Sequence, residues 1–309
     1  MSDSRAPASR NGEPGLFPIR TVATLTGVNA ITLRAWERRY GLVQPVRTDS
    51  GHRLYTQAHI DTIHQVLALL DKGVAIGQMR EALVVPTAGR GHSDADAPWA
   101  GYRERMIAAI SQFDENRLED VYNELLALYP NELATRRVLL PLLVELGMRW
   151  EKSAGSVAEE HFFGVFLRNK LGARFHHRSR RDTGPRLLAA CLPGEQHEVG
   201  LLLFALAAHD LGFRQVLLGA DMPLADLAYA ARRAQADAIV LSGSIEPRAG
   251  LLDVELAKLV REACRPVFVG GLTAVRHRDA IVAAGADPLG SDIAVGLRRI
   301  ADALAPAEG

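Results

Sequence analysis

Three residues near position 197 have the types and the spacing of a metal-binding loop. Glu195 and His197 follow a short apolar run, LLAACL at 187–192, and Gly200 comes three residues after the histidine. A neutral imidazole can bind a transition metal through one ring nitrogen, while a nearby carboxylate accepts the N–H of the other nitrogen and fixes the tautomer. A single loop histidine can equally be structural or solvated, so this pattern by itself leaves both interpretations open.

Basic side chains are concentrated near the N-terminus of a chain whose 36 basic and 36 acidic residues balance. Residues 18–55 contain six arginines and two acids, on a predicted helix over 29–40 and a glycine-centred hairpin after it. Guanidinium groups and tyrosine hydroxyls suit phosphate contacts on both sides of a helix inserted into a DNA groove. The alternative is that Trp36 and Tyr40 are core residues and the arginines solvate a helix. The candidate DNA contacts are Arg34, Arg38, Arg39, Tyr40, Arg47, His52, Arg53 and Tyr55.

A third group lies in the middle of the chain, where Trp150 precedes Glu160 and His161 at the start of a predicted helix. This spacing brings an indole, a carboxylate and an imidazole toward one pocket. A buried tryptophan and an acid in the first turns of a helix are each common, however, and the residues alone favour that simpler interpretation.

The elements that must position these groups fall into three units. In the last unit, residues 183–309, five short apolar runs alternate with amphipathic helices. This alternation predicts a parallel sheet covered on both faces, most simply a flavodoxin-like doubly wound fold. Such folds bind ligands at the carboxyl ends of their strands, where the strand order reverses, and His197 follows a strand. The predicted strands are 187–192, 215–219, 238–243, 266–271 and, more weakly, 287–289.

The first two units are predicted to be helical. Residues 99–182 contain four amphipathic segments with short connections, which predict an antiparallel four-helix bundle. Residues 16–85 begin with a helix, a turn at 26–28 and a second helix, as in a helix-turn-helix. The polar segments 1–15 and 86–98 are predicted to be a flexible tail and a linker.

The composition excludes several classes of protein. Hydrophobic residues make up 48% and charged residues 23% of the 309, which excludes a wholly disordered or fibrous chain. Two cysteines, Cys191 and Cys264, cannot form a disulfide framework and favour a reducing compartment. The N-terminus lacks a signal peptide and no apolar stretch reaches the roughly 20 residues of a membrane span. We therefore expect a cytoplasmic protein that is neither exported nor embedded in a membrane.

Residues 17–85 resemble the winged helix-turn-helix of the MerR family of transcription regulators almost position by position. The most specific stretch is WERRYGL at 36–42. The matching positions after it are Pro45, Arg47, Gly51, Arg53 and Tyr55. The resemblance implies a bacterial, nucleoid-associated regulator of double-stranded DNA, with Arg34 and Arg38 on the recognition helix. It assigns Arg47, Arg53 and Tyr55 to the wing and to contacts with the DNA backbone.

The patterns Glu-x-His-x-x-Gly at 195–200, AIVLSGS at 238–244 and VFVGG at 267–271 resemble the cobalamin-binding domain that holds its cofactor base-off and His-on. The resemblance implies that His197 is the lower axial cobalt ligand and that serine and glycines line a slot for the nucleotide tail. Two positions depart from many members similar to methionine synthase, which have Asp at the position of Glu195 and Leu at that of Ser244. The implied cofactor contacts are Glu195, His197, Gly200, Ser242, Gly270 and Gly271.

In this order of domains, Trp150, Glu160 and His161 resemble the cap of the CarH-type photoreceptor repressors. There the corresponding residues surround the 5′-deoxyadenosyl group of adenosylcobalamin. The resemblance implies a regulator that assembles in the dark as a dimer or tetramer on DNA and represses transcription. Light would cleave the cobalt–carbon bond, and loss of the adenosyl group would disassemble the oligomer.

One departure concerns the state after illumination. CarH-type photoreceptors place a histidine directly after the tryptophan, where it binds cobalt once the adenosyl group has gone, whereas this chain has Glu151. A carboxylate differs from imidazole in charge and softness. His176 and His177 can replace that ligand only if their end of the helix approaches the cobalt.

Two further functions compete with this one. A cofactor-independent regulator similar to MlrA would use the same scaffold for protein contacts and would not need the motif around His197. A cobalamin enzyme, such as a mutase or a methyltransferase component, is the third hypothesis. A mutase would bring a substrate barrel, for which this chain has no room once residues 16–85 are assigned. We therefore expect a regulator and not an enzyme.

Overall fold

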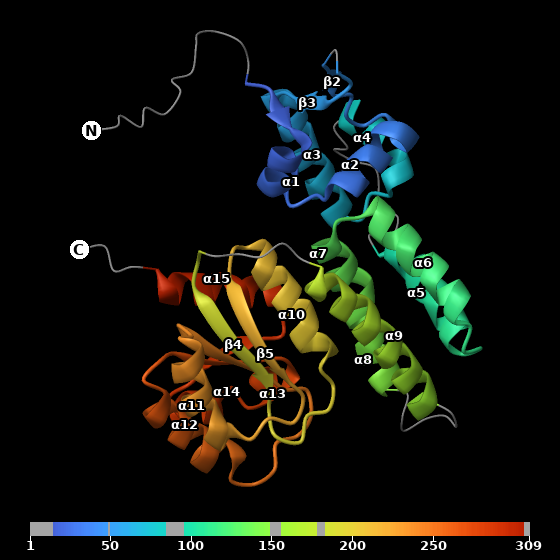
Figure 1. Ribbon diagram of the computed structural model, residues 1–309. Coiled ribbons are helices and arrows are strands. Elements are labelled where there is room, and N and C mark those ends of the chain that lie inside the picture. The colour runs from blue at the N-terminus through green and yellow to red at the C-terminus, as the bar shows by residue number, and fades with distance from the viewer. Residues whose placement is uncertain (1–14, 49, 85–95, 149–155, 178–182, 306–309) are drawn as a thin grey trace, which may run out of the picture. The chain divides into compact units, whose positions relative to one another are not determined.

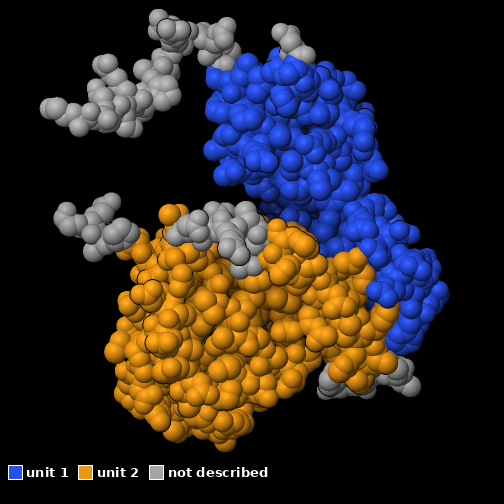
Figure 2. All heavy atoms as spheres, viewed as in Figure 1, with its two compact units in different colours: residues 1–142 blue, residues 143–309 orange. Residues whose placement is uncertain are grey.

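The computed structural model describes residues 15–48, 50–84, 96–148, 156–177 and 183–305. The chain forms two compact units, residues 1–142 and 143–309 (Figure 2). The division falls within the segment 99–182 that we expected to be one bundle, so the boundaries given above stay a prediction. Each unit is described by itself.

The N-terminal module, residues 15–84, is a helix-turn-helix with a three-stranded antiparallel wing (Figure 1). The turn between its first two helices uses Gly27, whose φ of 70° is left-handed, and the Asn29 side chain caps the second helix by accepting the Thr32 N–H. The strands lie in the order β1-β3-β2. The elements are β1 (Phe17–Pro18), α1 (Ile19–Thr26), α2 (Ala30–Ala35), η1 (Trp36–Tyr40), β2 (Val46–Arg47), β3 (Arg53–Tyr55), α3 (Gln57–Asp71), η2 (Ile76–Gln78) and α4 (Met79–Val84).

Helices also occupy the positions predicted for the bundle. The Asp114 side chain caps α6 by accepting the Arg117 N–H, and α7, η3 and α8 follow one another without a break. The first compact unit ends inside α8. These elements are α5 (Ala97–Ile110), α6 (Glu115–Leu128), α7 (Asn131–Ala134), η3 (Thr135–Leu139), α8 (Leu140–Met148) and α9 (Ser156–His176).

The last part of the chain is a five-stranded parallel sheet, as predicted, in the order β5-β4-β6-β7-β8. This order reverses between β4 and β6, which is the flavodoxin-like switch point. The remaining elements are β4 (Arg186–Cys191), α10 (Val199–Asp210), β5 (Arg214–Gly219), α11 (Leu224–Ala234), β6 (Ala238–Ser242), η4 (Leu251–Leu256), α12 (Ala257–Ala263), β7 (Val267–Gly270), α13 (Leu272–Arg276), α14 (Arg278–Ala283), β8 (Asp287–Gly290) and α15 (Ile293–Leu304).

Both faces of this sheet are covered, because alternate residues of each strand point to opposite sides. In β4, Leu188 and Ala190 face a core formed with α11 to α14, whereas Leu187, Ala189 and Cys191 face α10 and α15 (Figure 1). The loops that leave the carboxyl ends of β4 and β6 therefore meet at the switch point. Among the described residues, no helix is both long and apolar enough to cross a membrane.

Candidate functional site

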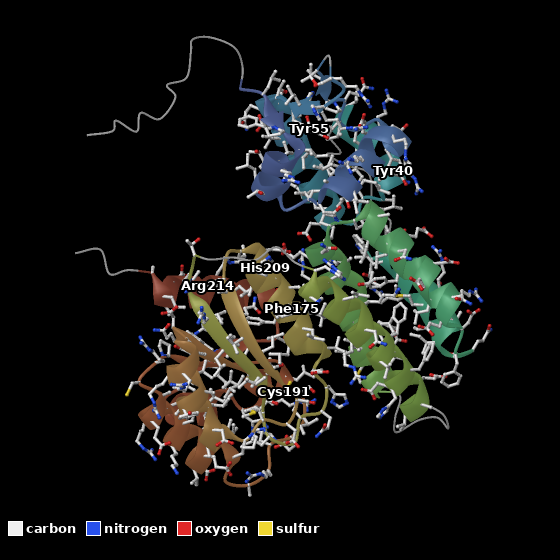
Figure 3. All side chains as sticks on the ribbon, in the orientation of Figure 1. Tyr40, Tyr55, Phe175, Cys191, His209 and Arg214 are labelled. Carbon is white, nitrogen blue, oxygen red and sulfur yellow. The ribbon has the colours of Figure 1, made fainter. Side chains whose placement is uncertain are left out.

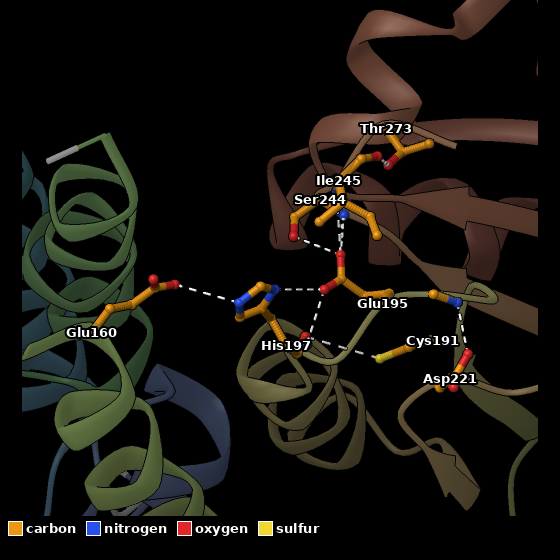
Figure 4. Close-up of polar contacts among 9 residues, drawn as sticks. Glu160, Cys191, Glu195, His197, Asp221, Ser244, Ile245 and Thr273 are labelled. Atoms are coloured by element: carbon orange, nitrogen blue, oxygen red, sulfur yellow. Dashed lines mark hydrogen bonds and ion pairs between the residues drawn. The ribbon is translucent and has the colours of Figure 1, made fainter. Parts of the chain in front are cut away.

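The site is built on the loop that follows β4, residues 192–198, which we call the His197 loop. Two hydrogen bonds tie this loop to the chain after β5: Gly194 N–H donates to Asp221 Oδ1 at 2.7 Å, and Asp221 N–H donates to the Glu195 carbonyl at 2.9 Å. The Glu195 side chain points back into the loop and is buried, with 1% exposed. Its Oε1 accepts the His197 N–H at 2.9 Å and lies 2.7 Å from His197 Nδ1 (Figure 4).

The second oxygen of Glu195 joins the His197 loop to the Ser244 loop, residues 243–250, which follows β6. Glu195 Oε2 accepts the Ser244 N–H and the Ser244 hydroxyl, both at 2.6 Å, and the Ile245 N–H at 3.2 Å (Figure 4). The Ser244 loop is in turn fixed to α13, because the Thr273 hydroxyl donates to the Ile245 carbonyl at 2.9 Å. One carboxylate thus connects the two loops that meet at the switch point.

These contacts decide the protonation of the imidazole. Burial by itself would raise the pKa of Glu195, but the hydrogen bonds from His197 and Ser244 outweigh it and lower that pKa to about 2. An ionised carboxylate only accepts hydrogen bonds, so His197 Nδ1 must carry the hydrogen of the 2.7 Å contact. The same hydrogen bond raises the pKa of His197. Nε2 is then the nitrogen that faces away from the loop, available to a proton or to a metal.

Nε2 of His197 faces α9. Glu160 Oε1 lies 3.5 Å from this nitrogen, and the Glu160 side chain is 14% exposed (Figure 4). Its second oxygen, Oε2, is buried and has no hydrogen-bond partner among the described residues. His161, the next residue of α9, has an exposed side chain and does not join the hydrogen bonds around His197 that the structure describes. Trp150 and Glu151 lie outside the described residues.

The buried thiol beside the site is a poor candidate ligand. Burial raises the pKa of Cys191 to about 12, so this residue stays a thiol, and its Sγ lies 4.0 Å from the His197 carbonyl (Figure 4). Two further histidines lie at the other end of α9. A helix rises about 1.5 Å per residue, so His176, the last residue of α9, lies about 24 Å along the helix from Glu160.

The glycines at the switch point have two different roles. A Cβ at Gly271 would lie 2.3 Å from the Gly243 carbonyl oxygen, and one at Gly243 would lie 2.6 Å from Leu192 Cδ1, so close packing of the loops requires both glycines. At Gly200 and Gly270 a Cβ would meet nothing nearer than 3.8 Å, the approach at Gly200 being to Ser242 Oγ. A Cβ at Gly200 or Gly270 would therefore make ordinary van der Waals contacts, so packing within the chain does not require glycine at either position. Gly243 was missed in the sequence, where glycine between two serines has no distinctive signal.

The predicted DNA contacts of the N-terminal module divide into three groups. Arg34, Arg38 and Arg39 have exposed side chains on α2 and η1, and Tyr40 is half-buried (Figure 3). His52 is exposed on the wing. Arg47 and Arg53 reach from the wing to Glu37, with nitrogen–oxygen distances of 3.1 and 2.6 Å.

Glu37 is a positioning residue that the sequence did not single out. Burial would raise its pKa, but the hydrogen bonds from Arg53 and Arg47 outweigh burial and lower it. The ionised Glu37 therefore fixes the wing against η1 and neutralises part of the basic surface. An acid within a run of arginines carries no signal in the sequence about which arginines it will meet.

Tyr55 corrects one prediction. Its side chain is 1% exposed and its hydroxyl is buried, without a hydrogen-bond partner among the residues described (Figure 3). The ring packs edge-on against His59, with 6.1 Å between ring centroids. Since β3 alternates its side chains and Tyr55 pairs with Phe17 of β1, the tyrosine points into the core of the module. A contact between Tyr55 and DNA would require the side chain to leave this buried position.

The family models agree with the two sites. A model described as MerR HTH family regulatory protein matches residues 17–84, and two models described as B12 binding domain match residues 102–174 and 185–297. The helix-turn-helix with its exposed arginines is typical of a DNA-binding regulator. The histidine loop at the switch point of the sheet is typical of a cobalamin domain. The chain belongs to the MerR family of transcription regulators that carry B12-binding domains.

Two relatives match along most of this chain, and a third matches less than half of it. It is 38% identical over 274 residues to the HTH-type transcriptional repressor CarH of Myxococcus xanthus, covering 85% of this chain and 91% of that protein. It is 33% identical over 275 residues to the HTH-type transcriptional repressor CarA of the same organism, covering 87% and 91%. The HTH-type transcriptional regulator MlrA of Escherichia coli K12 is 33% identical over 127 residues, which is 41% of this chain and 50% of MlrA.

A solved structure shares the fold. The monomethylamine corrinoid protein of Methanosarcina barkeri matches with a TM-score of 0.53 and 16% identity, covering 66% of this chain and 99% of that one. At this identity the match concerns the fold alone.

Proposed function

We propose that this regulator senses light through adenosylcobalamin, held base-off with His197 as the lower cobalt ligand. In the dark the loaded protein assembles as a dimer or tetramer on operator DNA and represses transcription. When bound, the cofactor supplies a cobalt–carbon bond that light cleaves, and loss of the adenosyl group lowers both the oligomeric state and the affinity for DNA. The observation that carries the proposal is the buried Glu195 carboxylate, which fixes the His197 tautomer at the switch point.

The lower side of the site fits a cobalt corrinoid. Imidazole nitrogen is a suitable ligand for a first-row transition metal, and Nε2 is the nitrogen of His197 that Glu195 leaves available. A carboxylate that accepts the other N–H also makes the imidazole a stronger ligand. The resemblance assigns the nucleotide tail to Gly200, Ser242 and Gly270, where packing within the chain does not itself require the two glycines. Gly271 allows the close approach of the neighbouring loop.

The upper side supports the adenosyl form. Glu160 Oε2 is buried without a donor among the described residues, and a buried acceptor left unpaired costs about 1–3 kcal/mol. The hydroxyl and amino groups of a 5′-deoxyadenosyl ligand would be suitable donors. Together with their resemblance to the cap motif, this supports Trp150, Glu160 and His161 as the residues that contact the adenosyl group.

The positions of the other candidate ligands also support a particular set of cobalt ligands after illumination. Glu151 stands where a second histidine would be needed, and His176 and His177 are too far along α9 to replace it. We therefore propose that cobalt keeps His197 as its single protein imidazole after illumination.

The DNA-binding half of the proposal rests on exposed basic side chains. Arg34, Arg38 and Arg39 lie on the recognition helix, while His52 and the arginines held by Glu37 form the wing. Arginines in this arrangement can reach base edges and phosphates of duplex DNA. Repression, rather than activation, is supported by the two full-length relatives, both of which are described as repressors.

The proposal is tested by loading the purified full chain with adenosylcobalamin in the dark, desalting it, and recording absorption spectra before and after green illumination. We expect retained cofactor with a base-off, His-ligated spectrum that changes in light without gaining a second imidazole ligand. The His197→Ala variant should retain less cofactor. Sedimentation and DNA gel shifts on the same samples should show a larger oligomer and tighter DNA binding in the dark.

The outcomes separate the hypotheses. Wild-type protein that retains no cobalamin would overturn the photoreceptor proposal and favour the cofactor-independent regulator. Retention without a light-dependent change in oligomer or DNA binding would reject light sensing and leave cobalamin as a structural or regulatory ligand.

A further inference from the structure

The separation of His197 and Glu160 is smaller than a bound corrin allows. Glu160 Oε1 lies 3.5 Å from His197 Nε2. A metal–imidazole bond is about 2 Å long, and non-bonded protein atoms stay about 3.5 Å from the far face of a flat ring. A corrin on His197 therefore keeps the Glu160 oxygen at least about 5.5 Å from Nε2. The described conformation is too tight by about 2 Å, before any upper ligand is counted.

His197 is not the part that moves. Its backbone N–H and its Nδ1 both bind Glu195, and Glu195 is buried and accepts three further hydrogen bonds from the Ser244 loop. Turning the imidazole away would break its 2.7 Å contact with the fixed carboxylate, a charge-assisted hydrogen bond of the stronger kind. The movement that admits a corrin must therefore come from Glu160 and the start of α9.

The structure also shows what holds α9 in the closed position. The helix packs along α10, whose N-terminal end directly follows the His197 loop. Arg168 of α9 lies 3.9 Å from Glu198, the residue that precedes α10, and both side chains are partly exposed. Contacts of this kind are individually weak, so this ion pair would not prevent the start of α9 from moving.

We propose that Glu160 closes the cobalamin cradle: its carboxylate takes the place beside His197 Nε2 that cobalt takes in the loaded protein. Cobalamin then enters only after Glu160 and the first turns of α9 have moved away. This inference rests on the proposed function for the identity of the ligand. It gives Glu160 a role that precedes any contact with an adenosyl group, because it sets how fast the cradle opens for loading.

The first test follows corrinoid loading into the full chain by stopped-flow absorption. The probe is diaquocobinamide, which has neither a nucleotide tail nor an adenosyl group, so displacement of the tail and the adenosyl contact do not affect the rate. With the probe in excess, the wild-type rate should level off as its concentration rises, because opening becomes limiting. Glu160→Ala should raise this limiting rate about tenfold, which corresponds to about 1.4 kcal/mol.

A matched control is available on the same helix. Glu159 precedes Glu160 and has no contact with His197 among those described, so Glu159→Ala makes the same change of charge and size one residue away. Glu159 is half-buried like Glu160. Its limiting rate should stay within about twofold of wild type, since the described contacts of His197 do not include Glu159. His197→Ala should lose the His-ligated spectrum.

The second test needs no corrinoid. Amide hydrogen exchange in the first turns of α9, residues 157–165, should be faster in Glu160→Ala and in His197→Ala than in the wild-type protein without cofactor. If the two side chains hold the helix through one contact, the double variant should exchange no faster than either single variant. Glu159 is the acid of the first turn of α9, so Glu159→Ala should speed exchange through the helix dipole, and its effect should add to that of His197→Ala.

The outcomes distinguish this inference from the proposed function. If wild-type protein binds neither cobinamide nor cobalamin at equilibrium, the proposed function fails and the loading role fails with it. If binding is intact but the rate rises in proportion to probe concentration and is the same in Glu160→Ala, closure alone is overturned. Additive or absent effects of Glu160→Ala and His197→Ala on hydrogen exchange would likewise overturn closure.

Discussion

The two residues that depart from the cobalamin-domain pattern, Glu195 and Ser244, contact each other. Where many related domains have Asp and Leu, this chain has Glu195 and Ser244, and the Glu195 carboxylate accepts both the N–H and the hydroxyl of Ser244. A leucine at position 244 would have no hydroxyl to donate to this carboxylate. Glu195 and Ser244 therefore help to place the imidazole through one contact that neither residue predicts alone.

Removing the Ser244 hydroxyl tests this contact. Ser244→Ala should lower the free energy of unfolding by about 2 kcal/mol, because hydrogen bonds to a buried charge are worth more than neutral ones. Cobalamin should also be retained about tenfold less tightly, since the carboxylate that orients the ligand is less fixed. Urea unfolding and equilibrium binding measure the two effects. Ser291→Ala, at an exposed serine, is the control, and equal effects of the two variants would contradict the assignment.

The burial of Tyr55 leads to a prediction about DNA binding. Tyr55→Phe removes a buried hydroxyl that has no partner among the described residues, so the free energy of unfolding should stay the same or rise by up to about 1 kcal/mol. DNA affinity should stay within about twofold, whereas Arg38→Ala on the exposed recognition helix should weaken it by about 1 kcal/mol or more. Gel shifts measure both. A large loss of affinity in Tyr55→Phe would show that the tyrosine turns outward on DNA.

At the scale of elements, the strands and their order of appearance were predictable from the sequence. The inner strands β4, β6 and β7 are largely apolar runs because both of their faces are covered, whereas the edge strand β8 has the sequence DPLG and gives a weaker signal. The structure confirms all five strands within a few residues. The helix-turn-helix was predictable from its spacing and from the turn at Gly27. The ligand loop was predictable because parallel strands deliver their loops to one edge.

The contacts between elements were not predictable, because they depend on which side chains meet after folding. Tyr55 occupies a strand position whose inward direction is fixed only by pairing with Phe17. Glu37 meets arginines that are ten and sixteen residues away across the wing. The approach of Glu160 to His197 joins α9 to the loop that follows the next strand, β4. The sequence predicted which single residues belong to the site, but it did not predict the contact partner of each one.

The wing provides a prediction at this scale. Glu37→Gln removes a charge that neutralises Arg47 and Arg53, so both arginines become available to phosphates. The slope of log affinity against log salt should become steeper by about one to two. Preference for operator over unrelated DNA should fall, because the wing is no longer fixed against the recognition helix. Glu81→Gln, on the exposed side of α4, makes the same change of charge and should leave the slope unchanged.

At the scale of the whole molecule, the first compact unit joins the recognition helix to the first bundle helices. The Trp36 indole N–H donates to the Leu128 carbonyl at 2.8 Å, and the Thr32 hydroxyl donates to the Leu126 carbonyl at 3.3 Å. Both acceptors lie in the last turn of α6, where carbonyls have no partner within the helix. Asp71 at the end of α3 pairs with Arg136 and Arg137 of η3. These contacts make the N-terminal module and α6 one body, so a displacement of α6 would carry the recognition helix with it.

Two tryptophans allow that connection to be measured. Trp36 and Trp99 are both fully buried, but Trp36 donates its N–H to α6 whereas the N–H of Trp99 has no hydrogen-bond partner among the described residues. Trp36→Phe should therefore lower the free energy of unfolding by about 2 kcal/mol more than Trp99→Phe, because only the first leaves a buried carbonyl unpaired. Urea unfolding of the full chain measures the difference.

The same pair of variants shows whether the connection transmits a signal. If α6 carries the recognition helix, Trp36→Phe should reduce the difference in DNA affinity between the dark and illuminated loaded protein, while Trp99→Phe should preserve it. Coupling between sites is a free energy that can be lost without loss of either site, so cobalamin retention should be the same in both variants. If Trp36→Phe leaves the difference in DNA affinity between dark and illuminated protein unchanged, the contact between Trp36 and α6 does not transmit the signal. The cofactor would then act on the N-terminal module in another way, such as through the change of oligomeric state.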